Sequence, residues 1–142
     1  MQVFIVGSPM ETAMALDPLR LNKQLLETQQ ILDALNGKKA WSKHPAVLQY
    51  KGYGSWLVIY RDVLKAYQRF DLANAILFDT YSERYRPKFH TQEYFDQMKR
   101  RLYTKNPEHY KQWESLGHSD CNWYWSPTEN KFIKYINGKR IE

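Results

Sequence analysis

The stretch from Leu16 to Lys38 constrains the fold most, because it has the features of one long amphipathic helix. Asp17 is a suitable N-cap, Pro18 follows at a position where its missing N–H costs nothing, and Gly37 is a suitable stop. Apolar residues and one threonine recur at spacings of three and four, so they share a stripe that we expect to be buried: Leu21, Leu25, Thr28, Leu32 and Leu35.

A second stripe of the same helix is polar and consists of Arg20, Lys23, Gln24, Glu27 and Gln30. It surrounds one carboxylate, Glu27, with two cations and two amides. One interpretation is a solvated face with a Lys23–Glu27 pair worth about 0.2–0.5 kcal/mol. The other is a functional face, and the spacing alone leaves both open.

Helical periodicity and capping residues continue through much of the chain. The expected helices cover Leu48 to Phe70, Leu72 to Phe78, a segment capped by Thr91, and a short segment from Asn106 to about Ser115. Residues 2–6 form a short β-branched and aromatic run that we expect to be extended. The sequence therefore predicts an all-α fold: a single compact domain over residues 1–142, with three to four helices, an extended N-terminal segment and an aromatic-basic C-terminal tail.

Composition points toward nucleic acid as a partner. The net charge is +6 and 15% of the residues are aromatic, and phosphates bind cations while unstacked bases bind ring faces. The single cysteine, Cys121, excludes an intramolecular disulfide and a thiolate cluster for zinc, and the histidines have no metal-ligand spacing. No run is long and apolar enough for a membrane span and no signal peptide is evident, so we expect a cytoplasmic protein. We also expect a monomer.

The tail from Asn122 onward interleaves rings with cations. The rings are Trp123, Tyr124, Trp125, Phe132 and Tyr135, and the cations are Lys131, Lys134, Lys139 and Arg140. Such a segment can contact a base and its phosphates, or it can pack its rings onto the helices and leave its lysines in solvent.

Several motifs are distributed along the chain. L-D-x-x-R-L-x-K-Q-x-x-E starts at Leu16, N-G-K at Asn36, W-x-x-H-P-A at Trp41, K-G-Y at Lys51, K-N-P-E-H-Y at Lys105, and F-I-K-Y-I-N-G-K at Phe132. Together they resemble the pyrimidine-dimer DNA glycosylases of the phage endonuclease V type and their bacterial relatives.

This resemblance implies a mechanism without metal or cofactor. In the family, the N-terminal α-amine attacks C1′ of the deoxyribose and expels the base, and a carboxylate stabilises the charge at the sugar. Carried over to this sequence, the catalytic groups are the amine of Met1 and the carboxylate of Glu27. The reaction is base release from damaged or modified pyrimidines, followed by nicking at the abasic site.

The resemblance also implies duplex DNA as the partner and the cytoplasm of a bacterium or a phage-infected host cell as the location. The expected DNA-binding residues are Arg20, Lys23, Gln24, Lys38, Lys39, His44, Lys99, Arg100, Lys131, Lys134, Tyr135, Lys139 and Arg140.

The chain departs from the family pattern at several positions, including residues 2 and 26. Gln2 is bulky where phage-type members have a small second residue, so we expect Met1 to be retained. Leu26 stands where the family has a phosphate-binding arginine. These departures leave a second hypothesis open, namely a catalytically inactive member of the fold that binds nucleic acid, a nucleotide or a protein.

Overall fold

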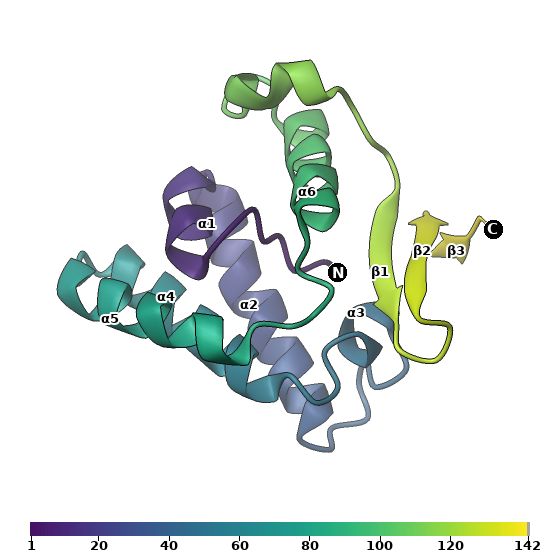
Figure 1. Cartoon of the computed structure of the whole chain (residues 1–142), viewed down its shortest axis with the longest axis horizontal. Helices are drawn as coiled ribbons and strands as arrows, with labels where there is room; N and C mark the ends of the chain where they lie inside the picture. The colour runs from purple at the N-terminus through teal and green to yellow at the C-terminus, as the bar shows by residue number, and fades with distance from the viewer. Residues whose placement is uncertain (142) are drawn as a thin grey trace.

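The computed structural model describes residues 1–141. Its α-helices are α1 (Pro9–Ala15), α2 (Pro18–Leu35), α3 (Pro45–Leu48), α4 (Gly54–Gln68), α5 (Leu72–Ser82) and α6 (Gln92–Lys105), and its 3-10 helices are η1 (Glu83–Tyr85) and η2 (Lys111–Leu116). The strands β1 (Asn122–Ser126), β2 (Lys131–Ile136) and β3 (Lys139–Arg140) form an antiparallel sheet in that order. Figure 1 shows the sheet at one end of the molecule and α5 at the other, with the N-terminus between α2, α6 and β1.

Helix α2 confirms the helix predicted from Leu16 to Lys38, with slightly shorter bounds. The Asp17 carboxylate accepts a hydrogen bond from the Arg20 backbone N–H at 2.8 Å, Pro18 is the first helical residue, and Gly37 adopts a φ of 107° after the helix end. Because a left-handed φ costs glycine nothing, Gly37 ends the helix as expected.

The buried side of α2 is rotated from the predicted stripe. Leu21, Thr28 and Leu32 are buried as expected, but so is Gln24, which is 1% exposed. Gln24 therefore lies in the core and not on the polar face that the spacing indicated.

The helix predicted from Leu48 to Phe70 is wrong in its first part. Helix α3 ends at Leu48, a turn follows, and α4 begins at Gly54. The break is at Gly52, whose φ of 85° is incompatible with a continuous right-handed helix. The predicted aromatic and aliphatic side of α4 is correct, since Leu57, Tyr60 and Leu64 are fully buried.

The helices after α4 agree only in part with the prediction. The Thr91 hydroxyl accepts a hydrogen bond from the Tyr94 N–H at 3.3 Å and starts α6, as predicted. Helix α5 extends to Ser82, four residues further than expected, whereas the segment after Asn106 forms turns and the 3-10 helix η2. Residues 1–141 thus contain more helices than the three to four expected.

The all-α prediction is wrong because the C-terminal segment folds as a sheet. β1 pairs with β2 from Asn122–Tyr135 to Ser126–Lys131, and Asn137 and Gly138, both with positive φ, make the two-residue turn to β3. Asn-Gly favours this hairpin turn. The predicted aromatic-basic tail is therefore a folded layer.

The rings of the sheet pack against the helical part. On one face, the Phe132 ring lies 5.4 Å from that of Tyr94 in α6, and the Trp125 ring lies 6.3 Å from that of Phe89. On the other face, Tyr124 is 4% exposed and its ring lies 5.7 Å from that of His44. Among the two interpretations of these rings, packing onto the fold is the one observed.

Candidate functional site

The first residues of the chain are threaded through the core between α2, α4 and α6. The Gln24 side chain holds them: its Nε2 donates to the Gln2 carbonyl at 2.8 Å, and its Oε1 accepts from the Phe4 N–H at 2.9 Å. The Tyr60 hydroxyl lies 2.9 Å from both the Phe4 carbonyl and Gln24 Oε1. The amide of Gln24 therefore substitutes for the strand partner that this extended segment lacks.

Glu27 lies one turn further along α2 and contacts the same segment. Its Oε2 accepts a hydrogen bond from the Gln2 backbone N–H at 3.1 Å. The Met1 carbonyl accepts from the Tyr124 hydroxyl of β1 at 2.6 Å. The Glu27 carboxylate thus binds the N–H of the second residue, and Tyr124 binds the carbonyl of the first, so this end of the chain is held by α2 and β1.

Gln2 explains how a bulky second residue is accommodated. Its side chain is buried, with 3% exposure, and its Nε2 donates to the Trp123 carbonyl at 3.0 Å and to the Tyr94 hydroxyl at 3.3 Å. This side chain fills the space between α6 and β1 and orients the residue before it. From the sequence, Gln2 indicated only that Met1 is retained.

His44 lies next to Tyr124, at the edge of this site. Its Nδ1 caps α3 by accepting from the Ala46 N–H at 3.0 Å, and its ring lies between Trp41, at 5.6 Å, and Tyr124. Burial lowers the pKa of His44, and the positive charge of the chain's amino terminus lowers it further. The histidine retained from the W-x-x-H-P-A motif is therefore electrostatically coupled to the amine of residue 1.

A cluster of four cations adjoins Glu27 and comes from two helices. Burial lowers the pKa of Lys105, and the nearby charges of Arg101, Arg20 and Lys23 lower it further, while the Glu27 carboxylate acts in the opposite direction. Like charges gathered in this way repel one another unless an anion binds between them. Arg20 and Lys23 were predicted site residues, whereas Arg101 and Lys105 were not.

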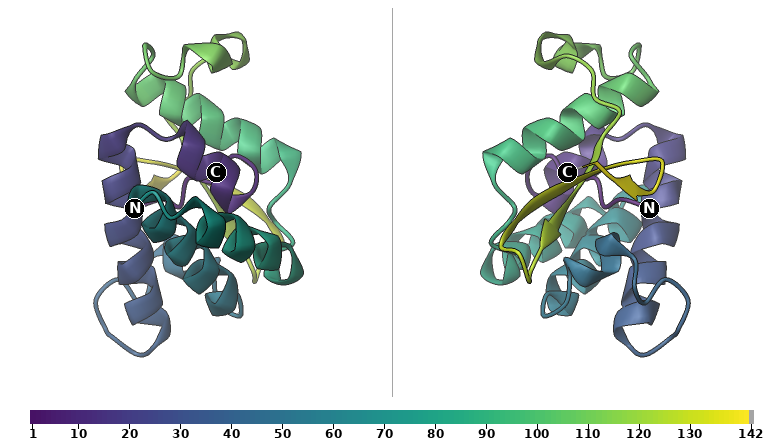
Figure 2. Two further views of the ribbon diagram at one scale, coloured as in Figure 1. Left: turned by 90° about the vertical axis from the view of Figure 1, so that its left-hand side faces the viewer. Right: turned by 90° about the vertical axis from the view of Figure 1, so that its right-hand side faces the viewer.

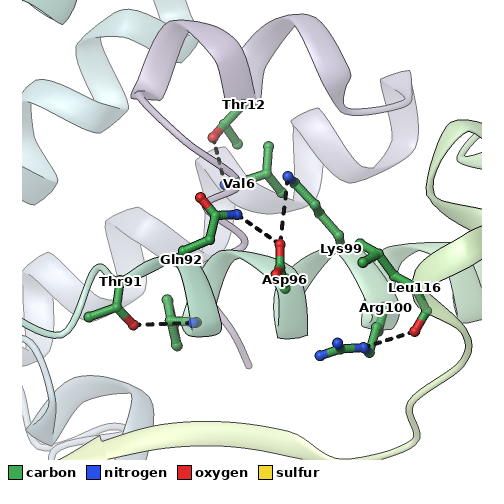
Figure 3. Close-up of polar contacts among 9 residues, drawn as sticks. Val6, Thr12, Thr91, Gln92, Asp96, Lys99, Arg100 and Leu116 are labelled. Carbon is green, nitrogen blue, oxygen red and sulfur yellow. Dashed lines mark hydrogen bonds and ion pairs between the residues drawn. The ribbon is translucent and has the colours of Figure 1, made fainter.

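Two predicted cations of α6 point elsewhere. Figure 3 shows Lys99 directed toward Asp96 and the segment with Val6 and Thr12, and Arg100 directed toward Leu116. The Lys99 Nζ lies 3.9 Å from Asp96 Oδ1, and the Arg100 Nε donates to the Leu116 carbonyl at 3.0 Å. These contacts give both side chains structural partners within the fold.

The remaining predicted residues lie at the periphery. Lys38 and Lys39 are exposed after α2, and Lys38 lies 3.5 Å from Asp33. In the sheet, Lys134 lies over the Trp123 ring. The exposed residues of β2 and β3 also include Lys131, Lys139 and Arg140, and Arg140 makes a bidentate contact with Glu129. Tyr135 is the exception, because its ring packs 5.4 Å from that of Tyr124.

A pocket of about 230 Å³ opens beside Tyr124 and Tyr135. Its walls are mainly apolar and include Pro45, Leu48 and Ile133 from α3 and β2. The site therefore combines an amine and a carboxylate with a cationic edge on one side and an apolar hollow on the other.

Residues 1–141 lack the features of two other classes of protein. No group of three or more His, Cys, Asp or Glu side chains with metal-binding geometry occurs in this part of the chain. Within the same residues, no helix has the length and hydropathy needed to cross a membrane.

Comparison with known protein families gives one match. The family model described as pyrimidine dimer DNA glycosylase matches residues 1–66. This match supports the predicted resemblance over the first 66 residues. The match to this glycosylase family covers Gln2, Gln24, Glu27 and His44, whereas Lys105 and the sheet lie beyond it. Searches of curated proteins and of solved structures returned no match.

Proposed function

We propose that the protein is a DNA N-glycosylase with associated abasic-site lyase activity, acting on damaged or modified pyrimidines in duplex DNA. The observation that carries the proposal is the 3.1 Å hydrogen bond from the Gln2 N–H to Glu27. It holds the one carboxylate of this face against the peptide group that links residue 1 to residue 2. The family match over the same residues supports DNA as the substrate.

The proposed reaction begins at the sugar. The Met1 amine attacks C1′, the bond from C1′ to the base breaks, and the base leaves with the electron pair and takes up a proton. Ring opening then gives an imine between the amine nitrogen and C1′. Removal of a proton from C2′ expels the 3′ phosphate and nicks the strand. Glu27 stabilises the positive charge at the sugar and moves protons during ring opening and elimination.

Substrate binding in this proposal relies on the cations around Glu27. Burial lowers the pKa of Lys105, and the charges of Arg101, Arg20 and Lys23 lower it further. DNA phosphates would relieve this repulsion. The target nucleotide must leave the base stack, at a cost of a few kcal/mol that damage reduces. Lys38, Lys39, His44 and the exposed cations of the sheet are proposed as further DNA contacts, whereas buried Gln24 is not.

Glu27→Gln tests the proposal. We expect the variant to bind damaged duplex DNA as the wild type does, but to release bases and nick abasic sites about a hundredfold more slowly, the scale of losing one positioned acid–base group. Glu114→Gln, at an exposed position of η2, is the matched control and should keep full activity. Unchanged nicking by Glu27→Gln would contradict the proposed role of Glu27.

A second candidate function is binding without chemistry. The observation that favours it is Leu26, which is 61% exposed where the resembled family has a phosphate-binding arginine. A binding protein would retain salt-sensitive affinity for damaged DNA, and neither the wild type nor any variant would release a base or nick a strand.

A further inference from the structure

Trp41 is an exposed tryptophan at a backbone position that disfavours it. It lies in the loop between α2 and α3, where the Ser42 N–H donates to the Lys39 carbonyl at 3.1 Å. Trp41 is the third residue of this turn and has a φ of 65°, in the left-handed region where glycine or asparagine is usual. Its side chain is 47% exposed. Neither burial in the core nor an easy backbone conformation explains a tryptophan at this position.

Exposure and an unfavourable φ alone do not identify a site, because Phe70 has both. The Phe70 side chain is 89% exposed and its φ is 61°. Phe70 lies in the turn between α4 and α5, and its two neighbours in the chain, Arg69 and Asp71, have opposite charges. Figure 1 shows this turn at the end of the molecule away from the sheet. Trp41 differs from Phe70 in the charge around it and in the contacts that connect it to residue 1.

The loop around Trp41 is cationic. Residues 36–46 include three lysines, Lys38, Lys39 and Lys43, and no Asp or Glu. All three lysines are exposed. An exposed ring among lysines suits a ligand that has both a flat apolar surface and phosphate groups, and nucleic acid has both.

Ring contacts connect Trp41 to the candidate site. Its ring lies 5.6 Å from that of His44 in an edge-to-face arrangement, and the His44 ring lies 5.7 Å from that of Tyr124. The Tyr124 hydroxyl donates to the Met1 carbonyl at 2.6 Å. The right view of Figure 2 shows the N-terminus beside α2 and the loop after α2 projecting from the lower end of the same helix. Because successive bases of a strand are about 3.4 Å apart, Trp41 is within reach of bases a few nucleotides from the one that Met1 attacks.

The indole ring keeps a surface on which a base can stack. Among residues 1–141, His44 provides the one ring contact of Trp41. A single edge-to-face contact leaves at least one face of the indole free of that partner. Stacking on an aromatic side chain is open to any base, because every base has a π-face.

We propose that Trp41 stacks on a base displaced from the DNA duplex near the attacked nucleotide, while the lysines of its loop bind the adjacent phosphates. This role rests on the proposed function, because extrusion of a nucleotide opens the base stack around it. The indole replaces a base–base contact that the distorted duplex has lost. Trp41 therefore makes damaged duplex bind more tightly than intact duplex.

The first test measures affinity for a duplex with a tetrahydrofuran abasic analogue, which forms no imine, so that binding is measured without chemistry. Trp41→Ala should weaken binding of this duplex roughly ten- to a hundredfold and should change binding of intact duplex little. Trp41→Phe should retain most of the affinity, because a phenyl ring also stacks. Phe70→Ala removes the other exposed ring at positive φ and is the matched control, which should bind as the wild type does.

Salt dependence separates stacking from charge. Because the indole is uncharged, Trp41→Ala should leave the slope of log affinity against log salt unchanged, whereas Lys39→Ala should reduce it by about 1. Unchanged affinity of Trp41→Ala for the abasic-analogue duplex, or a reduced slope, overturns the stacking role. If that affinity is unchanged while the wild type releases bases, the stacking role fails and the proposed function stands. A loss of affinity in Trp41→Ala, with a wild type that releases no base, has the reverse meaning.

The last test locates the contact. 5-Iodouracil is placed in turn at the positions that flank the abasic analogue and opposite it, and ultraviolet light then links this base to an aromatic ring stacked on it. Peptide mass spectrometry should identify Trp41 as the linked residue at one or a few of these positions, in the wild type and in Phe70→Ala alike. Links to other aromatic residues only, or no link while the duplex binds, overturn the proposal.

Discussion

Acid should destabilise this protein through one buried histidine, His90. Its side chain is 3% exposed, and its ring lies 4.5 Å from that of Trp56 and 4.9 Å from that of Phe89. The Nε2 atom is 2.9 Å from the Tyr50 hydroxyl. Burial, with a contribution from the positive charge of Arg86, lowers the pKa of His90 from 6.5 to about 3.

The sign and size of the effect follow from proton linkage. Between about pH 3 and pH 6.5 the unfolded chain binds a proton at His90 that the folded chain does not, so the free energy of unfolding falls as pH falls. From pH 7 to pH 4.5 the loss from His90 alone is about 2.5 kcal/mol. His44 acts in the same direction, because its pKa is also lowered.

Urea unfolding followed by tryptophan fluorescence at pH 7, 6, 5 and 4.5 measures this dependence. His90→Gln keeps a polar partner for Tyr50 and cannot titrate, so its stability should depend on pH less steeply than that of the wild type by about 2.5 kcal/mol over this range. His118→Gln, at an exposed histidine, should follow the wild type. If His90→Gln loses as much stability in acid as the wild type does, the burial argument is refuted.

Two further predictions concern the site. Gln24→Leu should lower the free energy of unfolding by roughly 2–5 kcal/mol in the same urea assay, because it leaves a buried carbonyl and a buried N–H of the N-terminal segment without partners; a loss below 1 kcal/mol would contradict this role. Replacing Lys23 and Lys105 together with Ala should reduce the slope of log affinity against log salt for duplex DNA by about 2, whereas the same change at exposed Lys65 and Lys88 should leave it unaltered.

The helices that could be predicted are those with strong local signals. Asp17 and Pro18 start α2, and Thr91 starts α6, through hydrogen bonds within one turn. The break before α4 was missed because apolar spacing continues across the turn at Gly52, and spacing alone does not report φ. Local chemistry thus determined where most helices begin but not where each one is interrupted.

The C-terminal sheet was not predicted, because its burial depends on tertiary contacts that the spacing of apolar residues does not report. Strands β1 and β2 have five and six residues, and their rings are buried only because α6 and α3 cover the two faces. The Asn137-Gly138 pair favours a hairpin turn, but it lies within the F-I-K-Y-I-N-G-K motif and did not enter the prediction of secondary structure. Without this turn, the alternation of rings and cations is equally compatible with a flexible tail.

The site was predictable where the family motif covers it. Glu27 was found through resemblance, whereas the burial of Gln24 depends on the N-terminal segment lying against α2. Arg101 and Lys105 belong to α6, and only the tertiary fold brings their charges near those of Arg20, Lys23 and Glu27 in α2. These three placements follow from tertiary packing, and no pattern within a single helix reports them.

In the proposed mechanism, the amine of residue 1 is the nucleophile and Glu27 assists it. The most direct measurement is borohydride reduction of the protein on abasic duplex DNA, because it converts the imine to a permanent adduct whose position peptide mass spectrometry can identify. The proposed mechanism predicts one adduct, on the α-amine of Met1, and none after that amine is acetylated. An adduct on the side chain of Lys105 or Lys23, or no adduct while DNA still binds, would contradict it.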